Sequence, residues 1–181
     1  MHAVSFKQAS FLLDVITKRF RAHGLVVHLQ KTKIVYCKKS NRQQDFAVVS
    51  FTFGGFDFRP RRSKNQQGEI FCGFLPAMSN VAVKTLHKRW RAMNITKRTQ
   101  VSLSDIAGEL DVWLPGVINY YKRFYPSKVA SVLRHLNWLL IKWAQKKYKR
   151  LRSKRRAWQW LKQVAARDPE LFAHWRFGAL P

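Results

Sequence analysis

The sequence is poor in acidic residues. Its 181 residues include 35 Lys and Arg but only nine Asp and Glu, which gives a formal net charge of +26 at pH 7. A compact body with this charge repels itself unless an anionic partner neutralises part of it. Nucleic acid is therefore the first candidate partner, and an anionic membrane surface is the second.

Cysteine and long apolar runs are also scarce. Neither Cys37 nor Cys72 belongs to a Cys-x-x-Cys motif, which argues against a zinc ribbon or a disulfide framework. Two free thiols are typical of a reducing compartment, so we expect a cytoplasmic protein. The longest apolar segment, at residues 136–144, is interrupted by Lys142 and is far shorter than the roughly 20 residues that span a bilayer. The N-terminal residues show no export signal, and we expect no membrane partner.

Aromatic residues, by contrast, are plentiful. The chain contains 13 Phe and 7 Trp, and 46% of it is hydrophobic. Disordered chains contain few such residues, so this composition predicts a folded protein. The length suits one domain or two small ones with a hydrophobic core.

The N-terminal 76 residues predict a helix followed by a small sheet. Apolar residues recur at helical spacing over residues 7–23, and Gly24 is placed to end that helix. Runs rich in β-branched and aromatic residues predict strands at residues 25–29, 31–36, 46–58 and 70–76. Gly54 and Gly55 predict a turn or bulge within the third run, and residues 59–69 a polar hairpin loop.

From residue 77 onward the pattern is helical. Ser79 can cap a helix that extends to Met93, and SLSD at residues 102–105 matches a capping box. Pro115 and Gly116 predict an interruption of the next helix. The helix that begins at Pro126 has one apolar stripe, formed by Val129, Val132, Leu133, Leu136, Leu139, Leu140 and Trp143. We therefore predict an α+β protein in which a small antiparallel sheet, within residues 1–76, leads into an all-α helical bundle at residues 77–181.

Positive charge is concentrated in the C-terminal half. Residues 112–167 contain fifteen Lys and Arg and no Asp or Glu. The basic run at residues 142–156 continues an amphipathic pattern, which favours a folded surface over a tail, although residues 150–156 could form a solvated hinge. Unbalanced basic residues on a folded surface are typical of phosphate contacts with nucleic acid, and a solvated helix face is the alternative.

A second candidate site lies at residues 119–125, where the sequence NYYKRFY places aromatic rings beside cations. Such rings can stack on unpaired bases while the cations hold phosphates, but we expect about half of the four rings to lie in the core. The predicted RNA-binding residues are Lys122, Arg123, Tyr120, Tyr121, Arg134, Lys142, Lys146, Lys149, Arg150, Arg152, Arg155 and Arg156.

No catalytic or metal-binding group can be recognised from the residues. The acidic cluster of Asp105, Glu109 and Asp111 is explained more simply by helix capping and the helix dipole than by a metal ion. The histidines are scattered, and no glycine-rich phosphate loop is present. We expect no catalytic residue, no metal ligand and no cofactor, and we expect the tryptophans to lie in the core or to cap the bundle.

Five stretches resemble one protein family in their order and spacing. They are GLVVHLQKTKIVYCKKSNR, FTFGGFDFRPR, GVINYYKRFYPS, LNWLLIKWAQKKYKRLR and AWQWLKQVAARDPELFAHW. Together they resemble the C-terminal part of group II intron-encoded reverse transcriptases, and the later ones resemble the maturase-specific domain. The resemblance implies that residues 1–76 correspond to the end of the polymerase palm and residues 77–181 to the maturase-specific thumb domain. It also implies binding of structured RNA, group II intron RNA above all, to assist RNA splicing.

The resemblance implies that the chain alone is not an enzyme. The family's polymerase chemistry uses carboxylates that hold two metal ions, supplied in part by a Tyr-x-Asp-Asp hairpin. This chain contains no Asp-Asp pair and begins after the position of that hairpin. It therefore resembles a truncated RNA-directed DNA polymerase. Mg²⁺ would be needed only if a separately encoded N-terminal reverse transcriptase half completed it. Such a split polymerase, a non-functional mobile-element remnant and a duplex DNA ligand remain alternatives.

Overall fold

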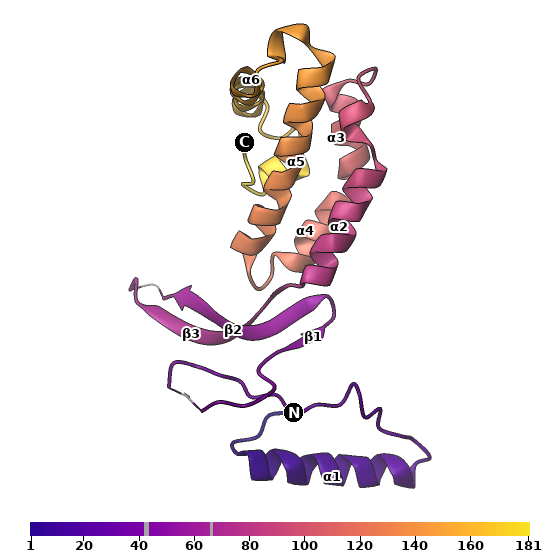
Figure 1. Cartoon of the computed structure of the whole chain (residues 1–181), viewed down its shortest axis with the longest axis vertical. Helices are drawn as coiled ribbons and strands as arrows, with labels where there is room; N and C mark the ends of the chain where they lie inside the picture. Colours follow the sequence, from indigo (N-terminus) through magenta and orange to yellow (C-terminus); the bar gives the residue numbers. More distant parts are fainter. Residues whose placement is uncertain (42–43, 66) are drawn as a thin grey trace. The chain divides into compact units, whose positions relative to one another are not determined.

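The computed structural model describes residues 1–41, 44–65 and 67–181 and has the predicted α+β fold (Figure 1). Contacts within the chain divide it into two compact units. The first comprises residues 1–51 with 58–74, and the second comprises residues 52–57 with 75–181. The domain boundary that the sequence places between residues 76 and 77 stays a prediction.

The first unit begins with an amphipathic helix, as predicted. Helix α1 spans Phe6–Ala22, and the hydroxyl of Ser5 caps it by accepting a hydrogen bond of 3.2 Å from the backbone N–H of Gln8. No residue of α1 is buried. Phe11 and Phe20 keep 65% and 43% of their surface exposed. The apolar residues of this helix are therefore only partly covered.

The sheet has three strands, β1 (Phe51–Phe53), β2 (Phe56–Lys64) and β3 (Ile70–Met78), paired in the order β1-β2-β3. Gly54 and Gly55 form the turn between β1 and β2 with φ of 55° and 76°, values that favour glycine in a two-residue hairpin. The polar loop predicted at residues 59–69 is wrong in its first half, because β2 continues to Lys64. Long basic side chains can lie along a strand while their charged ends stay in water.

The strands predicted at residues 25–29 and 31–36 are also wrong. Their backbone is irregular, and it makes local hydrogen bonds such as Leu25 N to Phe20 O and Lys31 N to His28 O. Val26 is 92% exposed. β-branched residues favour a strand mainly where a neighbouring strand offers packing and hydrogen bonds, and propensity alone does not supply that neighbour.

The second unit is a helical bundle. Its helices are α2 (Asn80–Ala92), α3 (Leu103–Asp111), α4 (Leu114–Tyr121), α5 (Pro126–Lys147), α6 (Lys154–Arg167) and α7 (Ala173–Arg176), with 3-10 turns η1 (Ile95–Lys97) and η2 (Lys149–Leu151). Helix α5 is central and contacts α4, α6, α7, η1 and η2 (Figure 1). Its predicted apolar stripe forms the core, with Leu136, Leu140 and Trp143 completely buried. Only Leu139 of the stripe stays partly exposed.

Local sequence sets several helix ends. The Ser79 hydroxyl caps α2, and Ser102 with Asp105 forms the predicted capping box of α3 through hydrogen bonds of 3.1 and 2.7 Å. The predicted interruption of the helix is present, but it lies at residues 112–113 and not at Pro115 itself. The chain leaves the helix before this residue, and Pro115 lies in the first turn of α4, where its missing N–H has no helical acceptor.

The C-terminal residues close the core around Asn137. The Oδ1 atom of this buried side chain accepts a hydrogen bond of 2.8 Å from Trp175 Nε1 and lies 2.8 Å from His174 Nε2, while its Nδ2 atom donates to Ala179 O at 2.8 Å. Complete burial, reinforced by Arg176, lowers the pKa of His174 to about 3. The imidazole is therefore neutral at physiological pH, and Nε2 carries its proton because Asn137 Oδ1 can only accept.

Candidate nucleic-acid interface

Eight of the predicted cations lie on one continuous segment from α5 through η2 into α6. We call this set the basic surface: Arg134, Lys142, Lys146, Lys149, Arg150, Arg152, Arg155 and Arg156. All eight are exposed. Buried residues between them, including Trp143, Leu151 and Ala157, attach the segment to the core. The basic run is therefore folded, and the residues considered as a solvated hinge contain a buried anchor at Leu151.

The carboxylates of α3 are occupied by other contacts. Asp105 belongs to the capping box, which holds its pKa below the usual range through hydrogen bonds with Ser102. Glu109 accepts two hydrogen bonds from Arg98, one of them 2.6 Å long, and these lower its pKa. Asp111 pairs with Arg176 at 2.6 Å. Within the described residues, no cluster of His, Cys, Asp and Glu could hold a metal ion.

The first turn of α6 carries cations, which the helix dipole disfavours at this end. Lys154, Arg155 and Arg156 occupy the first turn, and no acidic residue accompanies them there. The N-terminal end of a helix carries a partial positive charge, so cations at this place are disfavoured by roughly 0.3–1 kcal/mol each. A polyanion beside this turn would relieve the repulsion.

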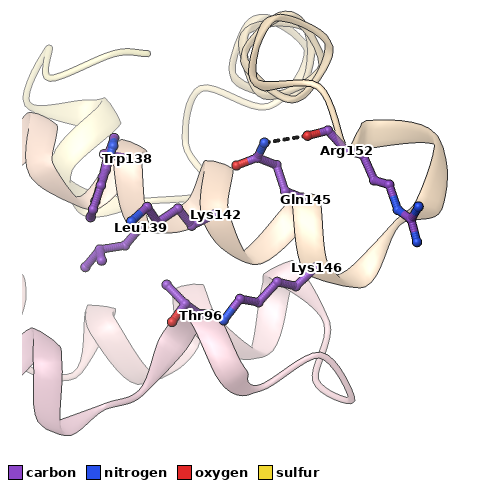
Figure 2. A pocket seen from close by; sticks show the side chains of 7 residues that line it. All are labelled: Thr96, Trp138, Leu139, Lys142, Gln145, Lys146 and Arg152. Carbon is purple, nitrogen blue, oxygen red and sulfur yellow. Dashed lines mark hydrogen bonds between the residues drawn. The ribbon is translucent and has the colours of Figure 1, made fainter.

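A groove opens within the basic surface, between α5, η1 and the residue that follows η2. Its volume is about 460 Å³, and it is lined by Thr96, Trp138, Leu139, Lys142, Gln145, Lys146 and Arg152. Figure 2 shows Lys146 extending from α5 toward Thr96, with Trp138 and Arg152 at opposite ends. The Gln145 side chain donates a hydrogen bond of 2.6 Å to Arg152 O and so links α5 to the residue that follows η2. No carboxylate lines the groove.

The aromatic residues at 119–125 pack against the β1–β2 turn. The rings of Tyr120, Tyr121 and Phe124 surround Phe56 at centroid distances of 5.3, 5.1 and 5.2 Å. The Tyr120 hydroxyl also donates to Gly54 O at 2.7 Å, although half of this side chain is exposed. Lys122 and Arg123 are fully exposed. Base stacking by the two tyrosines stays a prediction, because contacts with Phe56 already engage them.

Sequence reasoning missed two exposed tryptophans. The sequence predicts that the tryptophans lie in the core or cap the bundle; Trp90, Trp143 and Trp175 are buried in the core, whereas Trp138 and Trp158 keep 39% and 36% of their surface exposed and lie outside it. The helical phase carried a signal for Trp138. It lies four residues before Lys142 on α5, on the basic side of the helix rather than in the apolar stripe.

The fold and the surface together define a class: a small, strongly basic helical domain in which the segment from α5 into α6 carries the eight exposed cations of the basic surface and no carboxylate. Residues 83–162 match the family described as "Group II intron, maturase-specific domain". Within the helical unit, residues 83–162 are therefore similar to a group II intron maturase-specific domain. The resemblance to the C-terminal part of a maturase is confirmed, and all twelve predicted RNA-binding residues fall within the match. Comparisons with curated proteins and with solved structures find no significant match.

Two observations on the described residues relate to the predictions of no membrane partner and of a reducing compartment. None of the helices in the described ranges is long and apolar enough to cross a bilayer. Cys37 and Cys72 are both unpaired thiols. Neither cysteine belongs to the basic surface.

Proposed function

We propose that this chain is an RNA-binding module that binds structured RNA, with group II intron RNA as its ligand, and thereby assists splicing of that intron. One observation carries the proposal. Eight exposed cations occupy a single folded segment of a maturase-specific domain, and no carboxylate lies among them. Such a surface favours a ligand with closely spaced phosphates, because each contact releases counterions from the nucleic acid.

The proposal predicts a steep salt dependence of binding. If six or more phosphates are contacted, the affinity for a structured intron RNA should fall at least about a hundredfold between low and physiological salt. Filter binding or fluorescence anisotropy at several salt concentrations measures this slope. A flat salt response would contradict the proposal.

Charge-removal variants locate the interface. Arg155→Gln combined with Arg156→Gln should reduce the slope of log K against log salt by about 1.5, since each lost phosphate contact contributes roughly 0.7–0.9. The matched control is Lys84→Gln with Lys88→Gln, which removes the same charge from exposed positions on α2. Equal effects of the two pairs would mean that net charge, and not the basic surface, drives binding.

Splicing and ligand class need separate measurements. A group II intron transcript should splice faster at limiting Mg²⁺ when the protein is added, and the Arg155/Arg156 variant should lose this effect. Duplex DNA of equal length should compete more weakly than the intron RNA at fixed salt. Stronger competition by DNA would move the proposal to a DNA-binding function.

A second candidate is suggested by α1. A helix without any buried residue, which exposes Phe6, Phe11 and Phe20, is suited to an apolar partner surface. The partner would be a separately encoded half of a reverse transcriptase that brings the catalytic carboxylates and binds Mg²⁺. The chain alone should incorporate no nucleotide on a primed RNA template. Co-expression with a neighbouring reading frame that contains a Tyr-x-Asp-Asp motif should give a complex with activity.

A further inference from the structure

The groove within the basic surface has a size and lining suited to a nucleotide. Its volume of about 460 Å³ lies within the range of roughly 300–1,000 Å³ found for small-molecule sites. One end is aromatic, at Trp138, and the rest is lined mainly by polar and cationic side chains (Figure 2). A nucleotide has the same division into a flat aromatic base and an anionic phosphate.

The aromatic end belongs to a column of stacked rings. The Trp138 ring stacks on His135 with centroids 5.4 Å apart and planes inclined by 28°. His135 in turn stacks on His87 at 4.6 Å and on Trp90 at 5.8 Å, so the column reaches from α5 into α2. Burial lowers the pKa of His135 below its usual range, which keeps this ring neutral near pH 7. Trp138 therefore packs against neutral aromatic rings.

The ammonium group of a lysine also lies over the Trp138 ring. Lys142 Nζ lies 3.6 Å from the centre of the ring and lines the same groove. An exposed cation–π contact of this kind is weak, and the lysine stem is flexible. A planar base could take the place of the ammonium group on the indole. The displaced ammonium group would then be available to a phosphate.

The other cations of the groove lie beyond Trp138, where the phosphates next to a stacked base would be. Lys146 extends from α5 toward Thr96, and Arg152 lies at the end opposite Trp138 (Figure 2). The hydrogen bond from Gln145 to Arg152 O keeps that end attached to α5. A base on Trp138 would thus lead into a row of three cations.

We propose that this groove binds one unpaired nucleotide of the RNA, with its base stacked on Trp138 and its neighbouring phosphates held by Lys142, Lys146 and Arg152. The inference rests on the proposed RNA-binding function and adds a preference to it. In a base-paired helix both faces of a base are covered by its neighbours, so only an unpaired base can offer a face to the indole. Stacking of this kind tolerates any base.

Three RNA hairpins test the proposal: one with a single bulged adenosine, one fully paired, and one with an abasic residue at the bulge. Wild-type protein should bind the bulged hairpin at least about fivefold more tightly than the paired one, the effect of one stacked base. The abasic hairpin should bind like the paired one. This comparison separates stacking from the flexibility of the bulge and requires no protein variant.

Variants of the two exposed tryptophans provide the matched comparison. Trp138→Ala should abolish the preference for the bulged hairpin and leave affinity for the paired one within about twofold, while Trp138→Phe should keep most of the preference. Trp158→Ala removes an equally exposed indole from α6 and should leave the preference intact. A preference that survives Trp138→Ala in a folded protein, or that the abasic hairpin retains, overturns the inference.

The outcomes separate this inference from the function on which it rests. If neither hairpin binds, or if binding is independent of salt, the proposed function fails. If both bind with a steep salt dependence but with equal affinity, only the nucleotide site fails. The last measurement is competition between free adenosine monophosphate and the bulged hairpin. Displacement of the bulged hairpin by micromolar nucleotide would assign the groove to a free nucleotide and overturn the RNA site.

Discussion

The buried imidazole of His174 makes the helical bundle sensitive to acid. Its ring is completely buried, it lies 2.8 Å from Asn137 Oδ1, and its pKa is lowered to about 3. In the unfolded chain a histidine titrates near 6.5. The folded protein therefore gains stability from this residue above about pH 6.5, and the gain is lost progressively as the pH falls from 6.5 toward 3, because only the unfolded chain takes up the proton.

The size of the effect follows from the two pKa values. Between pH 7.5 and pH 5, the difference in proton uptake should cost the folded state about 2 kcal/mol at this one residue. His174→Gln removes the titrating group and keeps a side-chain N–H that can reach Asn137 Oδ1. Whatever its absolute stability at pH 7.5, the variant should lose about 2 kcal/mol less than the wild type on acidification.

Urea unfolding followed by tryptophan fluorescence measures this difference in the right part of the molecule, because all seven tryptophans lie in the helical unit. About 2 kcal/mol corresponds to a shift of the urea midpoint by about 0.7–2 M. His23→Gln, at an exposed position before the sheet, is the control. If wild type and His174→Gln lose the same stability between pH 7.5 and 5, the buried neutral imidazole is not the cause of acid sensitivity.

Two further predictions concern the packing that supports the basic surface. Gly55→Ala should destabilise the fold by about 1–3 kcal/mol, because φ at Gly55 is 76° and an added Cβ would lie 2.5 Å from the Tyr121 hydroxyl. The control is Gly116→Ala, in the open first half of α4, which should be neutral or stabilising by up to about 1 kcal/mol. Asp111→Ala should lower the free energy of unfolding in urea by about 1–3 kcal/mol. The substitution removes the carboxylate that accepts hydrogen bonds from the Ala173 N–H at 3.1 Å and from the Arg176 guanidinium at 2.6 Å. An unchanged urea midpoint would show that the α3–α7 contact contributes nothing to stability.

The parts of the fold that could be predicted are those specified locally. The caps at Ser79 and Ser102 follow from residues three positions apart, and the stripe of α5 follows from helical spacing. The strands expected at residues 25–29 and 31–36 failed because a strand depends on a neighbour that a single segment cannot specify. Pro115 predicts an interruption but not its exact position, because a proline can follow the end of one helix or stand in the first turn of the next.

Some features of the candidate site could also be predicted from the sequence, and others could not. Its cations could be predicted, because an uninterrupted excess of Lys and Arg is visible in the sequence. The groove could not be predicted, because Thr96 and Arg152 are brought together only when η1 and η2 pack on α5. The exposure of Trp138, in contrast, could be predicted from its helical phase, which places it outside the apolar stripe that contains the buried Trp143.

The hydrogen bonds around Asn137 have a consequence for synthesis of the protein on the ribosome. Asn137 is satisfied by residues up to 42 positions further along the chain, and Ala179 supplies one of its three partners. A nascent chain that has extruded α5 but not this segment holds an unpaired amide in an incomplete core, which opposes stable packing. Closure of the bundle must therefore wait until translation has passed residue 179, and until then the apolar side of α5 is accessible to chaperones.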